Sequence, residues 1–151
     1  MRKFILAAAA AVVATSTPAL ADTQTGDLNV TLNVIKGCSL DMPSGIDFGT
    51  KTIVGGGTSA SSSANVTVTC TSGTAYALTA NNGANASGTQ RRLSSGGTTP
   101  TYVNYTLGFP TASMTATGVA QTQLFSADIA SSVGAVPVGT YTDKVTVTLT
   151  F

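Results

Sequence analysis

The feature that most constrains this chain is the stretch 26–35, in which apolar and polar residues alternate. The even positions hold branched apolar residues (Leu28, Val30, Leu32, Val34), and the odd positions hold small polar ones (Asp27, Asn29, Thr31, Asn33). A period of two places all the apolar side chains on one face of an extended strand. No hairpin turn joins this stretch to a partner. The pattern therefore favours either an ordinary first strand of a β-domain or a detachable strand that completes the sheet of another molecule.

Residues 1–21 have the parts of a secretory signal peptide. A basic start, Met1-Arg2-Lys3, precedes the apolar run 4–13, and Ala19-Leu20-Ala21 supplies an A-x-A cleavage site before Asp22. The apolar run is too short for a transmembrane helix. We therefore expect an exported protein whose mature chain, the 151 residues less the first 21, has 130 residues and forms one domain.

The composition of the mature chain excludes several functions. Without Arg2 and Lys3, the seven basic residues fall to five against six Asp, so no basic surface for nucleic acid is expected. The chain has no His, no Glu and no Trp. The commonest general base and metal ligand is therefore missing, and the scattered Asp residues form no catalytic pair. We predict no enzyme activity, no catalytic residues, no metal site and no cofactor.

Cys38 and Cys70 are the only cysteines. An exported protein meets an oxidising compartment, so we predict one disulfide between them. It would close a loop of roughly 33 residues and stabilise the fold by about 3–4 kcal/mol in the chain-entropy model. A redox or nucleophilic role is the alternative, but it lacks both a CxxC spacing and a His partner.

The rest of the chain has the pattern of short strands between turn-rich loops. Strands are expected at 46–49, 65–70, 75–80, 103–109, 124–129 and 141–151, with Arg91-Arg92-Leu93 in a polar connection. In the last of them, alternation places Val145, Val147, Leu149 and Phe151 on the inward face. Six or seven such strands predict an all-β fold, an antiparallel β-sandwich of immunoglobulin-like type.

In order and spacing, these residues resemble the spore coat U domain family, which includes subunits of archaic chaperone–usher pili of the Csu type. The resemblance rests on the following pieces: 26–33 running into Gly37-Cys38, Phe48-Gly49, 66–70, Arg92-Leu93, Val103-Asn104-Tyr105 and 139–151. It spans nearly the whole mature chain. No single motif is specific, but their combination is.

The resemblance implies an incomplete, pilin-type immunoglobulin-like sandwich (37–151) preceded by a donor-strand extension (22–36). Such folds lack their final strand, which leaves a groove beside the C-terminal strand, here Val145, Val147, Leu149 and Phe151. A periplasmic chaperone fills that groove until the outer-membrane usher replaces its strand with the donor strand of a neighbouring subunit, here Leu28, Val30, Leu32 and Val34. The implied product is a head-to-tail pilus on the cell surface that supports adhesion and biofilm formation.

The sequence is also compatible with two other functions. A secreted coat-matrix protein of the same fold would share every one of these motifs. A surface-binding or carbohydrate-binding β-sandwich would use exposed loops such as 55–63 or 83–99. Chaperone and usher genes beside this gene would favour the pilus.

Overall fold

The computed structural model describes residues 22–53, 57–131 and 134–151. The predicted signal peptide, 1–21, lies outside the described residues. The chain divides into two units, 1–33 and 34–151. None of the described residues forms a helix with the length and hydropathy that a membrane crossing requires.

The described part of the first unit, 22–33, is extended chain without regular secondary structure. Its apolar side chains are open to solvent: Leu28, Val30 and Leu32 are 87%, 88% and 84% exposed. Branched apolar side chains are normally among the most buried, so three of them exposed on one strand face need an explanation.

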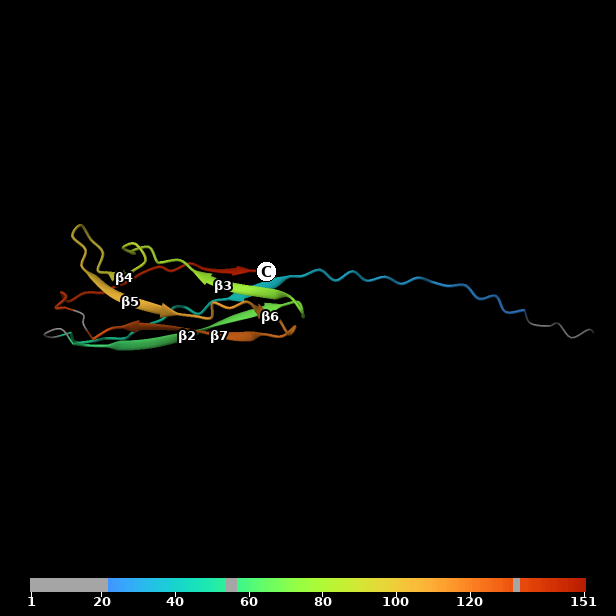
Figure 1. Ribbon diagram of the computed structural model, residues 1–151, viewed down its shortest axis with the longest axis horizontal. Coiled ribbons are helices and arrows are strands. Elements are labelled where there is room, and N and C mark those ends of the chain that lie inside the picture. The colour runs from blue at the N-terminus through green and yellow to red at the C-terminus, as the bar shows by residue number, and fades with distance from the viewer. Residues whose placement is uncertain (1–21, 54–56, 132–133) are drawn as a thin grey trace, which may run out of the picture. The chain divides into compact units, whose positions relative to one another are not determined.

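The second unit is all-β within the described residues, and its strands form two antiparallel sheets (Figure 1). The strands are β1 (Cys38–Asp41), β2 (Ala60–Cys70), β3 (Ala75–Ala80), β4 (Arg91–Ser94), β5 (Tyr102–Gly108), β6 (Met114–Thr115), β7 (Gln121–Ile129) and β8 (Val147–Thr150). One sheet has the order β1-β2-β7-β5-β4 and the other β6-β3-β8. The predicted β-sandwich is confirmed.

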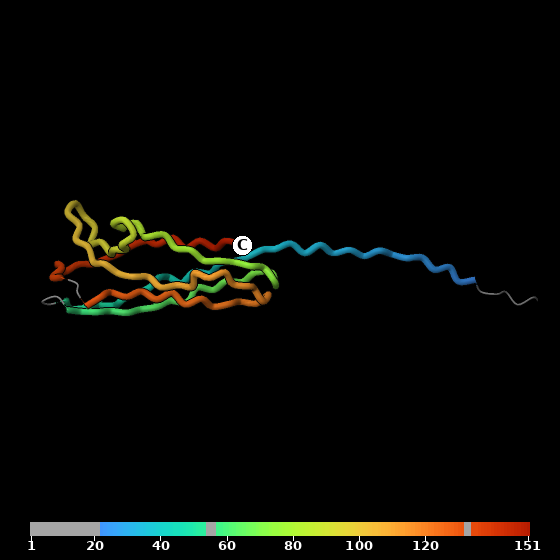
Figure 2. Tube along the Cα trace, viewed as in Figure 1, coloured from blue at the N-terminus to red at the C-terminus, as the bar shows by residue number. Residues whose placement is uncertain are grey.

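The long pair β2–β7 forms the centre of the larger sheet, as the tube in Figure 2 also shows. Along β2, small polar residues alternate with Val66, Val68 and Cys70, which are all buried. Along β7, Phe125, Ala127 and Ile129 are buried in the same alternating way. The two-residue period therefore gives this sheet one polar outer face and one apolar inner face.

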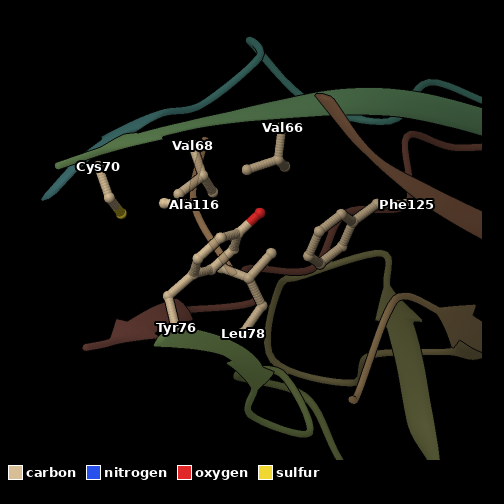
Figure 3. Close-up of a cluster of buried hydrophobic side chains, with 7 residues drawn as sticks. All are labelled: Val66, Val68, Cys70, Tyr76, Leu78, Ala116 and Phe125. Carbon is tan, nitrogen blue, oxygen red and sulfur yellow. The ribbon is translucent and has the colours of Figure 1, made fainter. Parts of the chain in front are cut away.

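The core lies between the two sheets. Tyr76 and Leu78 of β3 point toward Val66 and Val68 of β2, with Phe125 of β7 beside them (Figure 3). The buried hydroxyl of Tyr76 accepts a hydrogen bond from Gln123 Nε2 at 3.0 Å, so this polar group is satisfied inside the core. A second cluster, around Val103, Tyr105 and Ala127, fills the other end of the sandwich (the full set is Ala60, Val103, Tyr105, Ala127 and Ile129).

Cys38 and Cys70 form the predicted disulfide. They are direct partners in the β1–β2 register, and their Cα atoms lie 4.0 Å apart, somewhat closer than in most disulfides. The Thr71 amide donates to the Gly37 carbonyl, so the pair next to the cysteines, Gly37 and Thr71, is a hydrogen-bonded pair. The cysteines therefore occupy a non-hydrogen-bonded pair, where opposing side chains lie closest.

The strand prediction was wrong in several details, and the expected strand 141–151 is regular only over β8. Residues 91–94, expected in a connection, form strand β4, because Arg91 and Arg92 pair with Tyr105 and Asn104 across an antiparallel ladder. Residues 46–49, expected as a strand, have no regular secondary structure. There the Gly49 amide bonds the Asp47 side chain, a local turn that competes with a ladder.

Candidate strand-binding groove

The C-terminal segment 141–151 makes its main-chain hydrogen bonds on one side. Ser94 and Thr142 exchange two amide–carbonyl bonds of 2.9 Å, and the Ala84 and Asn81 amides donate to the Lys144 and Thr146 carbonyls at 3.0 Å. Further along, Thr148 and Thr150 of β8 pair in register with Thr79 and Ala77 of β3. On the side of the C-terminal segment, all these pairings involve even-numbered residues. They therefore leave from a single edge of the segment.

The opposite edge of this segment is open. In an antiparallel ladder, hydrogen-bonded and non-hydrogen-bonded pairs alternate. The main-chain groups of Val145, Val147 and Leu149 therefore face away from β3, and β8 is the last strand of its sheet among the described residues. An edge with unpaired N–H and C=O groups is a template for another strand.

Strand β1 presents a second open edge. It pairs with β2 only, and the Thr71–Gly37 bond fixes the phase of that pairing. By the same alternation, the main-chain groups of Cys38 and Leu40 point away from β2. The side chains of these two residues are half-buried and pack against the core. Strands β1 and β8 therefore each present an open edge, one in each sheet.

A cavity of about 300 Å³ opens between the segment that follows β1 and the segment that leads into β8. One wall contains Met42, Ile46 and Phe48, and the other contains Val145 and Val147. The floor belongs to the larger sheet and consists of Ala64, Val66, Leu93, Tyr105, Leu107, Phe125 and Ala127. Core side chains of three adjacent strands, β2, β7 and β5, thus line this cavity.

The inward residues of the C-terminal segment are only partly covered. Val147 and Leu149 pack against the cluster around Tyr76, and Val145 packs against the cluster around Tyr105. All three are half-buried, whereas Phe151 is 45% exposed. We refer to the surface formed by the cavity and these residues as the groove.

One end of the groove is polar, and sequence reasoning did not find it. The Tyr105 hydroxyl donates to Asp143 Oδ2 at 2.8 Å. The main-chain amide of Asn85 donates to Asp143 Oδ1 at 3.0 Å, and its side-chain Nδ2 donates at 3.2 Å. Burial raises the pKa of Tyr105 above its ordinary value, and the bond to Asp143 and the nearby negative charge raise it further.

The loop 81–90 carries Asn85 and is itself held by arginines. Arg91 donates to the Asn81 carbonyl at 2.8 Å through Nη2, and Arg92 donates to the Asn85 carbonyl at 2.9 Å through Nε. Gly83 has φ +91°, and a Cβ added there would collide with the Asp143 carboxylate. Glycine at 83 therefore lets the loop close over Asp143. The pair Arg91-Arg92 was visible in the sequence, but its partners were not.

The sequence-predicted residues fall into three groups. Cys38 and Cys70 are bonded to each other. Val145, Val147 and Leu149 lie together along the groove, with Phe151 following them on the same face of the segment. Val34 belongs to the second unit and is 67% exposed, whereas Leu28, Val30 and Leu32 belong to the first. The donor and acceptor roles of these residues stay predictions.

The chemistry of the groove is that of a binding surface. Its lining is mainly apolar, and its inward-facing carboxylate, Asp143, already accepts three hydrogen bonds. Within the described part of the chain, no group of three or more His, Cys, Asp or Glu residues is placed to hold a metal ion. An apolar trough with free main-chain groups along its edges suits an extended peptide.

Comparison with known proteins adds two findings. Residues 24–148 match the model of the Spore Coat Protein U domain. The fold is similar to a chain in the crystal structure of the CsuC–CsuE chaperone–tip adhesion subunit pre-assembly complex from archaic chaperone–usher Csu pili of Acinetobacter baumannii, with a TM-score of 0.55 and 22% identity. That similarity covers 78% of this chain but only 40% of the other. No curated protein sequence matches the chain.

Proposed function

Because the chain belongs to the Spore Coat Protein U domain family, we propose that it is a structural pilus subunit assembled by the chaperone–usher pathway through donor-strand exchange. The observation that carries this proposal is the groove, whose two sheet edges are open and whose floor is the core itself. The complementary element is the exposed apolar row Leu28, Val30, Leu32 and Val34. The chain thus has a sheet with an open edge at β8, and it has an apolar strand face at 28–34 that is exposed.

The energetics favour a tight joint. Burying four branched side chains at about 1.5–3 kcal/mol each gives an upper bound near 6–12 kcal/mol. Each net main-chain hydrogen bond along the open edge adds about 0.5–1.5 kcal/mol. This mode of binding is β-augmentation, in which main-chain bonds give affinity and alternate side chains give specificity. Because donor and acceptor surfaces differ, the contact is head to tail and propagates as a fibre.

The partners follow from the same surfaces. A periplasmic chaperone would fill the groove with its own strand before assembly, and an outer-membrane usher would direct the exchange. The similar chain from a chaperone–subunit complex supports this, although this chain spans about two fifths of its length. The signal peptide predicted for residues 1–21 supports passage through the periplasm to a surface pilus. Neighbouring copies of the chain, or related subunits, would supply the donor strand.

The test compares two substitutions on opposite faces of the proposed donor strand. Leu32→Asp places a charge in the desolvated groove at a cost of several kcal/mol, whereas Asn33→Asp places it on the outer face. We expect the Leu32→Asp chain to be exported, disulfide-bonded and chaperone-bound, yet absent from polymers on denaturing gels and in electron micrographs. Asn33→Asp should polymerise like the unmodified chain.

Two outcomes would contradict the proposal. If Leu32→Asp polymerises normally, the strand 26–35 is not the donor. If Leu32→Asp unfolds the chaperone-bound subunit, the stretch is an ordinary core strand of its own domain. Far-ultraviolet circular dichroism of the purified complex distinguishes loss of folding from loss of assembly.

A role in adhesion and biofilm formation is the cellular consequence of the same proposal. A polymer of exported subunits would extend from the cell and contact surfaces through its exposed loops. Cells that produce Leu32→Asp should therefore leave less attached biomass on an abiotic surface than cells that produce Asn33→Asp. Equal attached biomass for the two variants would contradict the role in adhesion, but it would not contradict the proposal that the chain is a pilus subunit.

A further inference from the structure

We propose that Lys36 of one copy pairs with Asp143 of the next copy, and that this charge pair fixes the register and direction of the inserted strand. The inference rests on the proposed function. It adds a residue outside the apolar row, and it predicts one particular alignment among those that the alternation allows.

The first step is the state of Asp143. Its carboxylate accepts hydrogen bonds from Tyr105 and Asn85, which are neutral donors. No salt bridge to Asp143 occurs within the described residues, so no basic side chain there pairs with it directly. The side chain is half-buried and lines the cavity. A strand laid into the groove would remove more of its water, which disfavours a charged carboxylate unless a cation arrives with the strand.

The second step is the identity of that cation. Of the five basic residues that follow residue 21, Arg91 and Arg92 are engaged by main-chain carbonyls. Lys144 is exposed and lies on the other face of its segment from Asp143, as its even number requires. Lys51 is exposed in the connection before β2. The remaining cation is Lys36, which is exposed and lies two residues after Val34, the end of the proposed donor row.

The third step is the alignment. Lys36 continues the even-numbered phase of Leu28, Val30, Leu32 and Val34, and Asp143 begins the odd-numbered phase of Val145, Val147, Leu149 and Phe151. With the strands antiparallel, one register matches both rows completely, with the following opposite pairs: Lys36 and Asp143, Val34 and Val145, Leu32 and Val147, Val30 and Leu149, Leu28 and Phe151. The parallel arrangement of the same rows would place Gly26 opposite Asp143 and leave Lys36 without a carboxylate.

The alignment also satisfies the main chain. The open-edge groups of β8 belong to Val147 and Leu149, and the preceding Val145 follows the same phase. In the proposed register, these residues form hydrogen-bonded pairs with Val34, Leu32 and Val30. The pairs between them, Asn33 with Thr146 and Thr31 with Thr148, are then non-hydrogen-bonded pairs on the outer face. Opposing side chains come closest at such pairs, which makes them suitable for cysteine cross-linking.

The register is tested with full-length chains that carry one new cysteine on each strand. Asn33→Cys with Thr146→Cys should give a covalent ladder of multimers on non-reducing gels of the assembled polymer. Asn33→Cys with Thr150→Cys reports the parallel arrangement and should give none, since Cα atoms beyond about 7 Å cannot be bridged. Chains with Asn33→Cys alone control for random dimers.

The charge pair is tested on the polymer formed by the cross-linkable chain. Lys36→Glu should lower the cross-linked fraction about two- to fivefold, the range expected for losing a partly exposed ion pair. Adding Asp143→Asn, which keeps a hydrogen-bond acceptor at this position, should restore most of that fraction. Lys51→Glu makes the same charge change away from the groove and should have no effect.

Each outcome decides the matter. An efficient Asn33–Thr146 ladder that Lys36→Glu weakens and Asp143→Asn rescues supports the proposal. A ladder that Lys36→Glu leaves unchanged, or a ladder from Asn33–Thr150 instead, overturns it while the donor-strand mechanism stands. If the unmodified chain forms no polymer at all, the proposed function fails first, and the charge pair fails with it.

Discussion

At the scale of single residues, the end of the groove depends on the Tyr105 hydroxyl. This side chain is 6% exposed, and it reaches Asp143 across 38 residues of sequence. Asn85 reaches the same carboxylate across 58 residues. No local pattern encodes such pairs, because alternation specifies which face a residue takes but not which strand lies opposite. The sequence therefore predicted the apolar wall of the groove and missed its polar end.

Replacing Tyr105 tests this polar end. Tyr105→Phe removes a buried hydrogen bond to a charged acceptor and should lower the free energy of unfolding by about 1.5–3 kcal/mol. The pKa of Tyr105 is raised on folding, so its contribution is complete below about pH 10, where free tyrosine begins to ionise, and declines as the pH rises further. Urea unfolding of the monomeric Leu32→Asp chain at a series of pH values measures both effects.

The matched control for that experiment is Tyr102→Phe. Tyr102 is 39% exposed, and its ring stacks on the Arg92 guanidinium at 4.0 Å, a contact that phenylalanine keeps. Its loss of a hydroxyl should change the free energy of unfolding little. The same alkaline slope in Tyr105→Phe and in the unmodified protein would contradict a raised pKa at Tyr105.

At the scale of strands, the open edges have different supports. Strands β1 and β8 each have four residues and one neighbouring strand, but the residues before β8 are also bonded by the loop 81–84, whereas β1 is cross-linked to its neighbour. The cysteine pair compensates for this shortness by fixing β1 to the central strand β2. The sequence predicted the pairing because only two cysteines exist, but the short length of β1 came only from the structure.

Removing the disulfide tests that support. Cys38→Ala with Cys70→Ala should lower the free energy of unfolding by about 2–4 kcal/mol, because the unfolded chain regains the freedom that the cross-link removed. Urea unfolding of the Leu32→Asp chain is the measurement, and adding a reductant to the cysteine-containing chain should reproduce the loss. The exposed neighbour Ser39→Ala is the control. Equal urea midpoints with and without the disulfide would contradict a stabilising role for it.

At the scale of the whole molecule, the proposed assembly depends on two stretches. The alternation of 27–34 and of 141–151 was evident from the sequence, and so was the sandwich to which the second contributes a strand. The order of the strands was not evident, because β2 pairs with β7 rather than with its sequence neighbour β3. The same long-range order leaves β1 and β8 as edges, so the groove is a property of topology and not of any one motif.

The proposed separation of the donor strand from the acceptor groove leads to a prediction for mixed assembly. The Leu32→Asp chain keeps an intact groove but has a defective donor strand, so it can accept a neighbour's strand and cannot donate its own. Added to unmodified subunits during assembly, it should join one end of a growing fibre and stop growth there. Mean fibre length in electron micrographs should therefore fall as its share rises, while Asn33→Asp at the same share should leave length unchanged. A Leu32→Asp chain that is incorporated throughout long fibres would show that donation does not depend on the apolar row, and one that never joins a fibre would show that its groove is not an acceptor.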